Sequence, residues 1–367
     1  MEKILVYALS ENVGGIENYV LNLTRYNTST SQVKFGYIVL GEKTPYSNEI
    51  AKYNSSLYYI PTRKKFILNI IKSFFLFKKL RKEYSIVYFN TSSIGYIVPY
   101  IFAILFKYKI YLHAHSDASK TSSEIKKIIH KMNYRIVRRW IDKRFCCSTE
   151  AAKWMFLQDY SMAKFIPNAI EVGRFSYNET YRKDIRQLFD IGDALVIGNI
   201  GRLYKLKNQE LLIDILAEIN RSINTYLLLV GDGEDKQLLI ERATSKKVSN
   251  KVIFTGQVAA PEKYLSAMDC FVMPSLTEGF PTVIVEAQAS GIPCVCSDCI
   301  TKEVNISGNV AYVSLNQPVA FWKDTILKSL GPRYDCREEL INADFDVRSS
   351  VPRITKYLKL SGVEYEN

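Results

Sequence analysis

The sequence predicts an α/β protein built from two doubly wound parallel sheets, one in each half of the chain. Short β-branched runs alternate with helical patterns, and the runs are apolar almost throughout, which is typical of parallel strands covered by helices on both faces. The length of 367 residues fits two domains. A polar, poorly periodic stretch separates the halves. We therefore expect a first Rossmann-like domain over residues 1–168, a linker over 169–192, a second Rossmann-like domain over 193–345 and a C-terminal helix or tail over 346–367.

The first half begins directly with a strand and then alternates strands with helices. β-branched and aromatic runs predict the strands, and periodic apolar residues between them predict the helices. The apolar stretch 94–106 is interrupted by Pro99 and is shorter than the roughly 20 residues of a bilayer span, so we interpret it as a buried helix. The predicted strands are residues 3–9, 33–40, 86–90, 109–113 and 144–148, and the predicted helices are residues 16–26, 66–81, 94–106 and 122–140.

The second half repeats this alternation with shorter elements. Its strand candidates are again almost continuously apolar, and a proline stands at or just before the start of two of its helices, where a missing N–H does no harm. The predicted strands are residues 195–200, 226–230, 252–255, 270–273 and 293–297, and the predicted helices are residues 209–219, 236–243, 261–267 and 282–289.

Charge is distributed unevenly between the two halves. The chain has 49 Lys and Arg against 37 Asp and Glu, and residues 1–168 hold 26 of the basic and 11 of the acidic side chains. The first half is therefore strongly cationic, which favours a polyanionic partner such as an anionic membrane surface or a nucleic acid. A composition of 47% hydrophobic and 23% charged residues excludes a disordered chain and an integral membrane protein.

The seven cysteines do not form a disulfide framework. Cys294, Cys296 and Cys299 lie close together, but no fourth Cys or His is near enough in sequence to complete a zinc site. We interpret the cysteines as reduced core residues. The N-terminus lacks the long apolar core of a signal peptide, so we expect a cytoplasmic protein.

The segment 274–298 carries the strongest functional signal. It holds two glutamates, Glu278 and Glu286, on either side of a predicted helix start marked by Gly279 and Pro281. Free amides at that helix N-terminus would form an anion site suited to a diphosphate. Glu278 could accept hydrogen bonds from substrate hydroxyls, and Glu286 could bind the hydroxyls of a ribose. The alternative is that Glu286 is a solvated helix residue, but its apolar neighbours leave little exposed face.

Two further segments of the second half follow predicted strands. Gly201 and Arg202 end one strand and Lys207 precedes the next helix, so two cations could clamp a diphosphate and neutralise a leaving group. The alternative is a solvated basic loop. Gly231 follows another strand, where it lets the backbone approach a ligand or closes a tight connection. The absence of a third glycine excludes a dinucleotide fingerprint there.

In the first half, Gly14 and Gly15 open a helix directly after the first strand, and Glu17 lies in its first turn. This glycine pair permits close approach of a phosphate or a sugar, or it forms an ordinary loop. His113 and His115 end another strand, where histidine suits hydroxyl recognition or proton transfer. We expect alternation to send them to opposite faces, so that one reaches a ligand and the other packs.

Together these motifs resemble the GT-B glycosyltransferases and, within them, the retaining family known as family 4. The likeness covers nearly the whole chain. It is most specific over residues 198–297, where Gly-Arg…Lys-Asn, Val-Gly-Asp-Gly, Phe-x-Gly and Glu-Gly-Phe-Pro…Glu-Ala follow in the family's order and spacing. The Gly-Gly-Ile-Glu and His-Ala-His segments resemble the branch that builds bacterial capsules and exopolysaccharides. The resemblance implies two Rossmann-like domains that face each other across a cleft.

The resemblance also implies residue roles. Arg202 and Lys207 would hold the donor diphosphate, Glu286 its ribose and Glu278 the transferred sugar, while His115 contacts that sugar near the reacting face. The implied catalytic residues are Arg202, Lys207, Glu278 and His115. The implied donor site further includes Gly15, Gly201, Gly231, Gly279, Phe280, Pro281, Thr282 and Val283, and the implied acceptor side includes Gly14, Glu17 and His113.

The expected reaction is transfer of a hexosyl group from a nucleotide-diphosphate sugar, a UDP-sugar, to a hydroxyl of a lipid-linked or growing saccharide, with retention. We expect no bound metal or other cofactor and no nucleic acid partner. Two basic, apolar segments, residues 63–82 and 126–144, are either ordinary packing helices or a docking surface for the anionic inner face of the plasma membrane. The alternatives to transfer are a sugar-nucleotide epimerase or phosphorylase of the same fold and a non-enzymatic nucleotide-sugar sensor.

Overall fold

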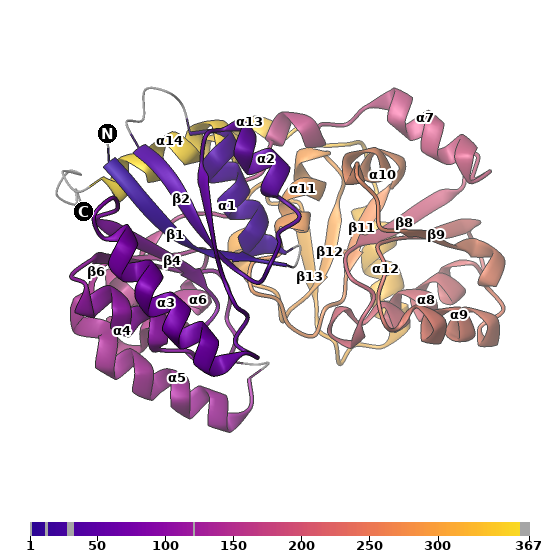
Figure 1. The fold of residues 1–367 in the computed structure, drawn as a ribbon. Helices are drawn as coiled ribbons and strands as arrows, with labels where there is room; N and C mark the ends of the chain where they lie inside the picture. The colour runs from indigo at the N-terminus through magenta and orange to yellow at the C-terminus, as the bar shows by residue number, and fades with distance from the viewer. Residues whose placement is uncertain (1, 12–13, 28–32, 120–121, 360–367) are drawn as a thin grey trace. The chain divides into compact units, whose positions relative to one another are not determined.

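The chain forms two compact units in the computed structural model, which describes residues 2–11, 14–27, 33–119 and 122–359 (Figure 1). Unit 1 comprises residues 1–169 and 347–367, and unit 2 comprises residues 170–346. Each unit is built on one parallel sheet with helices on both faces. The structure therefore confirms the predicted α/β class with two parallel-sheet domains.

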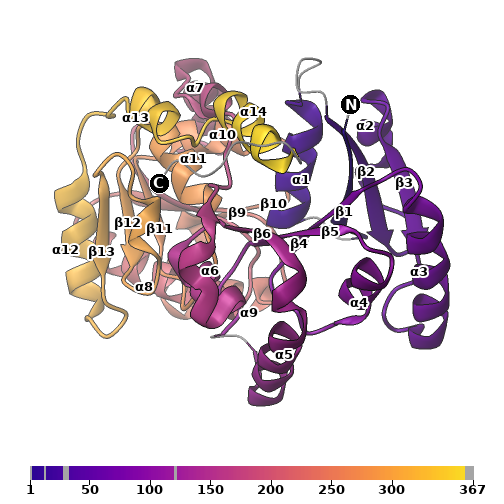
Figure 2. The same ribbon diagram turned by 90° about the vertical axis from the view of Figure 1, so that its left-hand side faces the viewer.

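Unit 1 has a seven-stranded sheet in the order β3-β2-β1-β4-β5-β6-β7. The order reverses between β1 and β4, so the helix that follows β1 covers one face and those that follow β3, β4 and β5 cover the other. Figure 2 shows α3, α4 and α5 in a row, away from α1. The strands are β1 (Glu2–Ser10), β2 (Val33–Leu40), β3 (Ser56–Ile60), β4 (Ile86–Thr91), β5 (Lys109–Ala114), β6 (Ile141–Cys146) and β7 (Lys164–Phe165). The helices that lie between them are α1 (Gly15–Arg25), α2 (Ser47–Lys52), α3 (Phe66–Leu80), α4 (Val98–Leu105), α5 (Glu124–Val137) and α6 (Thr149–Phe156).

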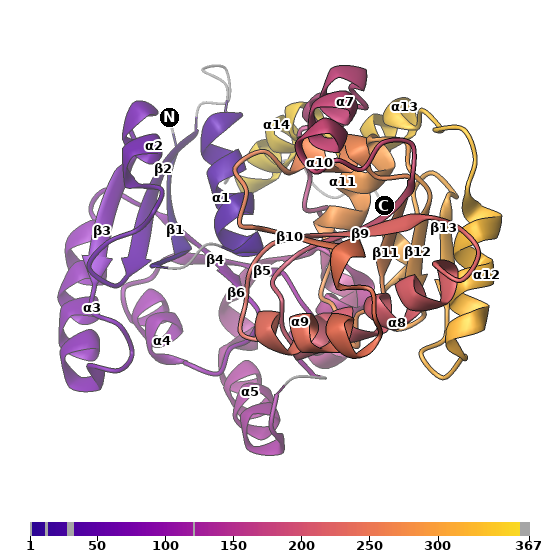
Figure 3. The ribbon, with the colours of Figure 1, turned by 90° about the vertical axis from the view of Figure 1, so that its right-hand side faces the viewer.

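Unit 2 has a six-stranded sheet in the order β10-β9-β8-β11-β12-β13, which reverses between β8 and β11. Figure 3 shows α10 and α11 on one side of this sheet and α8, α9 and α12 on the other. The strands are β8 (Leu195–Ile200), β9 (Thr225–Val230), β10 (Val252–Gly256), β11 (Cys270–Met273), β12 (Cys294–Ser297) and β13 (Val310–Val313). The helices are α7 (Glu179–Leu188), α8 (Gln209–Ile219), α9 (Lys236–Ser245), α10 (Pro261–Ala267), α11 (Thr282–Ala289), α12 (Val319–Ser329) and α13 (Arg337–Asn342).

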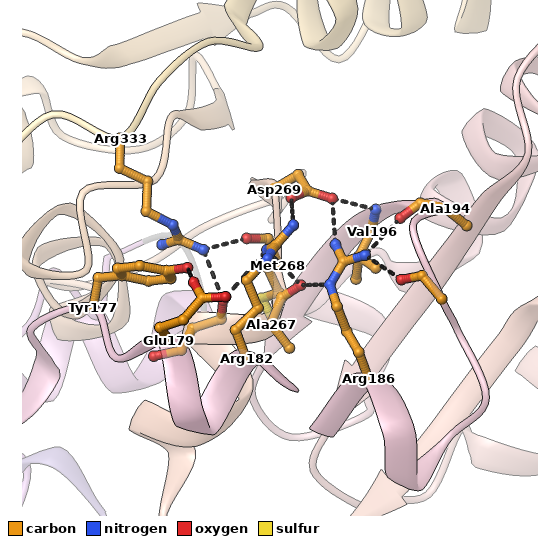
Figure 4. A network of polar contacts seen from close by, with 12 residues as sticks. Tyr177, Glu179, Arg182, Arg186, Ala194, Val196, Ala267, Met268, Asp269 and Arg333 are labelled. Carbon is orange, nitrogen blue, oxygen red and sulfur yellow. Dashed lines mark hydrogen bonds and ion pairs between the residues drawn. The ribbon is translucent and has the colours of Figure 1, made fainter. Parts of the chain in front are cut away.

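Residues 170–192, expected as a linker, belong instead to unit 2. Their helix α7 contributes Arg182 and Arg186, and each arginine donates to one carboxylate oxygen of Asp269 at 2.7 Å (Figure 4). Arg186 also donates to two backbone carbonyls just before β8. Because ion pairs rather than an apolar stripe hold α7 in place, its sequence shows too few apolar residues for periodicity to reveal it.

The C-terminal segment, expected as a helix or tail, returns to unit 1 as helix α14 (Val347–Leu358). Val347, Val351, Ile354 and Leu358 enter the same apolar cluster as the buried residues of α1, β1 and β2. The spacing of these four side chains gives the helix one apolar stripe, which unit 1 covers.

Most predicted elements agree with the structure to within a few residues, including α8, α10, α11, β2, β8 and β11, whose bounds are the predicted ones. All seven cysteines are free thiols, and six of them are buried. No helix in the described part of the chain is long and apolar enough to cross a bilayer.

Candidate functional site

The second-half motifs meet at the carboxyl edge of the unit 2 sheet. Strands β9, β8 and β11 are neighbours, and the loops that follow them carry Gly231, residues 201–207 and residues 274–281. Because parallel strands end at the same edge, these three loops lie side by side. Ligands bind at this edge, next to the reversal of strand order, in open α/β sheets.

Lys207 and Glu278 form a partly buried ion pair between two of these loops. Lys207 Nζ lies 2.7 Å from Glu278 Oε1, and the two side chains are only 14% and 13% exposed. Lys207 ends a short 3-10 turn, and the amide of Leu276 donates to the carbonyl of Leu206 in that turn at 2.8 Å. The pair and this backbone bond fix the loop of Glu278 against the cation. Removing either partner would leave an uncompensated charge away from water.

Arg202 lies at the same edge but points to a different carboxylate. Its Nε and a terminal nitrogen each lie 3.0 Å from Glu234 Oε2, and both side chains are more than half exposed. Ion pairs this exposed contribute little, so a stronger anion could displace Glu234 at small cost. Arg202 and Lys207 are thus held by separate acidic partners. Glu234 is a residue that the sequence analysis did not select.

The glycines of these loops have a packing role. A Cβ on Gly231, whose φ is +137°, would lie 2.0 Å from the carbonyl oxygen of Gly201, and a Cβ on Gly233 would lie 2.1 Å from that of Leu203. The loops after β8 and β9 therefore touch backbone to backbone. This packing fits the tight connection offered for Gly231, and its contact with a donor stays a prediction.

The N-terminus of α11 presents unpaired backbone donors. Pro281 is the N-cap, and Thr282 is the first residue of the helix. The amides of Thr282 and Val283 make no backbone hydrogen bond within the described part of the chain. Such amides and the helix dipole favour a bound anion. The Phe280 side chain is buried and stacks on Phe345 with ring centroids 5.8 Å apart, so only its backbone could serve a ligand.

Glu286 lies in the second turn of α11 and is half-buried. Burial raises the pKa of its carboxyl to about 7, although the positive charge of Arg174 opposes that shift. Arg174 itself pairs with Glu262 at 3.0 Å. The Glu286 carboxyl accepts no hydrogen bond from the described residues. A half-buried carboxyl that has no donor within the protein is suited to accept hydrogen bonds from ligand hydroxyls.

In unit 1, Gly14 and Gly15 differ in their surroundings. A Cβ on Gly14 would meet Glu17 Oε2 at 2.8 Å, whereas one on Gly15 would meet no described atom within 4 Å. Packing therefore gives no reason for glycine at position 15, at the start of α1. Glu17 accepts a hydrogen bond from Ser10 Oγ at 2.7 Å, which anchors the helix start to the end of β1.

His113 and His115 lie on the same face of the β5 strand end, with ring centroids 4.0 Å apart. The expectation of opposite faces is wrong, because side chains alternate with a period of two and these residues are two apart. Tyr19 of α1 packs against both rings. Both histidines are buried, and this burial lowers the pKa of His115 to about 3 and that of His113 well below its usual value, so both are neutral.

The histidines are fixed by polar residues that sequence reasoning missed. His113 Nδ1 lies 2.6 Å from the hydroxyl of Tyr88, and the ring nitrogens of His115 lie 2.9 Å from Asn90 and 3.2 Å from Asn168. Tyr88 and Asn90 belong to β4, whose residues pair with those of β5. Polar side chains near the end of an otherwise apolar strand were the available signal.

The described residues include no group of three or more His, Cys, Asp or Glu side chains placed to hold a metal ion. The structure leaves the sequence-based site residues in two sets. Unit 2 brings together the loops of Arg202, Lys207 and Glu278 with α11, and unit 1 brings together the strand ends that carry the glycine pair and the histidines.

The proteins that this chain resembles are glycosyltransferases. The model of glycosyl transferases group 1 matches residues 181–326. Over 380 aligned residues the chain is 28% identical to the glycosyltransferase EpsF of Bacillus subtilis, covering 98% of this chain and 97% of that protein. It is 26% identical over 330 residues to an Escherichia coli UDP-Gal:alpha-D-GlcNAc-diphosphoundecaprenol alpha-1,3-galactosyltransferase, covering 81% and 82%.

Solved structures confirm the fold. HepE of Anabaena in complex with UDP-glucose superposes with a TM-score of 0.75 at 19% identity, covering 97% of this chain and 95% of that one. A glycosyltransferase of Rickettsia africae superposes with a TM-score of 0.77 at 16% identity, covering 98% and 99%. The two parallel-sheet units therefore have the GT-B fold.

Proposed function

We propose the reaction in full from two findings: residues 181–326 match the model of glycosyl transferases group 1, and the chain has the GT-B fold. The protein transfers a hexosyl group from a UDP-sugar to a hydroxyl of a lipid-linked or growing saccharide, with retention of the anomeric configuration. It does so during synthesis of a bacterial surface polysaccharide, a capsule or an exopolysaccharide, at the inner face of the plasma membrane.

One observation carries this proposal. At the carboxyl edge of unit 2, the loop after β8 carries the mostly buried Lys207 and also Arg202, whose exposed ion pair with Glu234 is weak. Two unpaired amides at the start of α11 lie at the same edge. Together they supply positive charge and N–H donors for a diphosphate. In transfer, negative charge develops on the departing nucleotide diphosphate, and donors already in place stabilise it without reorganisation. Lys207 and Arg202 are the proposed groups for this task.

The other donor contacts follow from the geometry around α11. Glu286 lies one turn from the amides of Thr282 and Val283, so its carboxyl would receive the ribose hydroxyls of a nucleotide whose diphosphate lies at those amides. Glu278 keeps a second carboxylate oxygen beyond the one that pairs with Lys207, and this oxygen can accept from a hydroxyl of the sugar. We propose that Gly279–Thr282 backbone atoms complete the donor site and that no metal is required.

The donor and acceptor classes are supported by the relatives. The Escherichia coli relative, aligned over most of both chains, carries UDP-Gal and a diphosphoundecaprenol-linked sugar in its name, and its product linkage is alpha. An alpha product from an alpha-linked donor is the outcome of retention. HepE of Anabaena is solved with UDP and with UDP-glucose. These relatives favour UDP and a lipid-linked acceptor for this chain.

Unit 1 supplies the proposed acceptor side and two proposed contacts to the donor. Gly15, which packing does not require, is proposed to admit the donor phosphates, and Gly14 and Glu17 shape the helix start beside it. His115 remains the proposed contact to the transferred sugar, and His113 supports it through the shared ring packing. Because burial lowers its pKa to about 3, His115 would act as a neutral group, and it would have to exchange its bond to Asn90 or Asn168 for one to the sugar.

The test is product formation from UDP-galactose or UDP-glucose with a short-chain lipid diphosphate saccharide, followed by proton NMR of the new anomeric centre. The proposal expects an alpha-linked product that needs both substrates, and a Lys207→Ala variant that forms it at least about a hundredfold more slowly. An epimerised nucleotide sugar from donor alone would identify an epimerase. Tight binding of donor without turnover would identify a sensor, and a beta-linked product would exclude retention.

A further inference from the structure

Three neighbouring helices of unit 1 expose apolar side chains where water would be expected. On α3, Ile67 is 73% exposed and Phe75 is 63% exposed, while Asn69 and Ser73 are buried. The inward face of this helix is thus partly polar and its outward face apolar. A helix that packs only on its own sheet shows the reverse arrangement.

Helix α5 shows the same exposure along a single stripe. Ile125 is 70% exposed, and the further exposed members lie three, four, seven and eleven residues on. This spacing places them on one side of the helix. The stripe consists of Ile125, Ile128, Ile129, Met132 and Ile136.

Helix α4 lies between α3 and α5 and joins their apolar surfaces. Phe74 of α3 packs edge-on against Phe102 of α4 and against Phe106, which follows that helix. Leu105 of α4 and Trp140, just after α5, are each about half exposed and continue the surface. Figure 2 shows the three helices in a row on one side of the unit. We call the exposed apolar side chains of α3, α4 and α5, together with Trp140, the apolar row.

Basic side chains surround the apolar row. Residues 63–82 contain eight Lys and Arg and no Asp or Glu, and residues 122–141 contain six against the single Glu124. Within the described part of the chain, several of these side chains are exposed and form no ion pair, namely Lys72, Lys78, Lys79, Lys126, Lys131 and Arg135. A pocket of about 480 Å³ opens beside Trp140 and is lined in part by Lys107 and Arg139.

This charge decides between the possible occupants of the surface. A second copy of the chain would bring the same cations against themselves, and like charges repel. An anionic bilayer instead offers acyl chains to the apolar side chains and phosphate groups to the lysines and arginines, which is the pattern of interfacial helices. Trp140 is of the residue type that prefers the boundary between headgroup and acyl chain.

We infer that the apolar row docks unit 1 onto an anionic lipid bilayer. The inference rests on the proposed function for its purpose, since a lipid-linked acceptor lies in such a bilayer. In a parallel sheet, helix N-termini lie at the carboxyl edge of the strands. Phe66, Ile67 and Ile125, in the first turns of α3 and α5, are therefore at the edge that carries Gly15 and His115. Docking brings the leaflet to that edge.

The experiment measures binding of the full chain to vesicles of phosphatidylcholine alone and of phosphatidylcholine with phosphatidylglycerol. The quadruple variant Ile67→Gln, Phe75→Gln, Ile125→Gln and Ile128→Gln should bind the anionic vesicles at least about tenfold more weakly than the parent chain. Leu188→Gln is the matched control, because Leu188 is 66% exposed on α7 of unit 2. It should bind as the parent does.

Each result has one meaning. The inference would be overturned if the parent chain bound anionic vesicles only weakly, or bound neutral vesicles as tightly as anionic ones. It would also be overturned if the quadruple variant bound anionic vesicles as tightly as the parent does. A lipid-free dimer that the quadruple variant dissociates would assign the surface to a second copy instead. Transfer to a water-soluble acceptor should be unchanged in the variant. If the parent itself lacks that transfer, the proposed function fails while the vesicle result still stands, and matching thermal unfolding shows that the variant is folded.

Discussion

Donor binding should become tighter as the pH rises through the titration of Glu286. Burial raises the pKa of this carboxyl to about 7 in the free protein, and ribose hydroxyls donate to its ionised form. Binding therefore favours loss of the proton. The parent chain and Glu286→Gln, which cannot ionise, form the matched pair for this prediction.

The size of the effect follows from the pKa. A carboxyl of pKa about 7 is about 3% ionised at about pH 5.5 and about 97% ionised at about pH 8.5. If the bound carboxyl returns to a pKa of about 4.5, the dissociation constant falls about 30-fold across this range, equivalent to about 2 kcal/mol. His113 and His115 do not contribute, because burial lowers the pKa of His115 to about 3 and that of His113 well below its usual value.

Isothermal titration calorimetry with UDP-glucose is the suitable assay, because its diphosphate diester does not titrate in this range. The parent chain should show the rise in affinity and release a proton on binding near neutral pH, and Glu286→Gln should show neither. Equal pH dependence in both proteins would refute the assignment of Glu286 to the ribose.

The same raised pKa makes a prediction about stability. The native protein holds a proton on Glu286 between the unfolded pKa and about 7, so stability falls as the pH rises through that interval. Glu286→Gln should therefore unfold at a higher temperature than the parent at about pH 8 and at a similar temperature at about pH 5. A lower melting temperature for the variant at both values would contradict this.

The remaining predictions concern the loops and the C-terminal helix. Lys207→Ala should reduce turnover by orders of magnitude while far-ultraviolet circular dichroism stays unchanged, and near-parental turnover would refute its role. Gly231→Ala should lower stability by about 3 kcal/mol or more in urea unfolding, because its Cβ would lie 2.0 Å from a carbonyl oxygen. Gly15→Ala should leave stability within about 0.5 kcal/mol yet reduce transfer, and full activity would show that no ligand approaches there. Deleting residues 347–367 should make unit 1 insoluble, because four core side chains would be lost, and a soluble, cooperatively unfolding product would contradict this.

The elements with strong local patterns could be predicted from sequence. Helix α11 and strands β8 and β11 have clear starts and ends, because Gly and Pro flank apolar runs there. Several elements were missed, among them β13 and α7. Strand β13 is short and only partly buried, and α7 is held by Asp269, a partner distant in sequence. The C-terminal helix α14 was expected, but its place on the unit 1 core depends on equally distant partners. No local pattern reports such partners.

The candidate site was likewise predicted in part. Spacing after the strands located the loops of Arg202, Lys207 and Glu278, because chain order fixes which edge of a parallel sheet a loop occupies. Spacing could not show that Glu278 and Glu234 each neutralise one of the two cations. It also could not reveal the partners of the histidines, since Asn90 and Asn168 come from a neighbouring strand and from a segment more than fifty residues away.

A crystal structure of the chain with UDP tests the central assignment most directly. The account predicts a diphosphate whose oxygens contact Lys207 and the amides of Thr282 and Val283, and ribose hydroxyls on Glu286. A nucleotide bound at any other edge of unit 2, or no nucleotide at millimolar UDP, would contradict it.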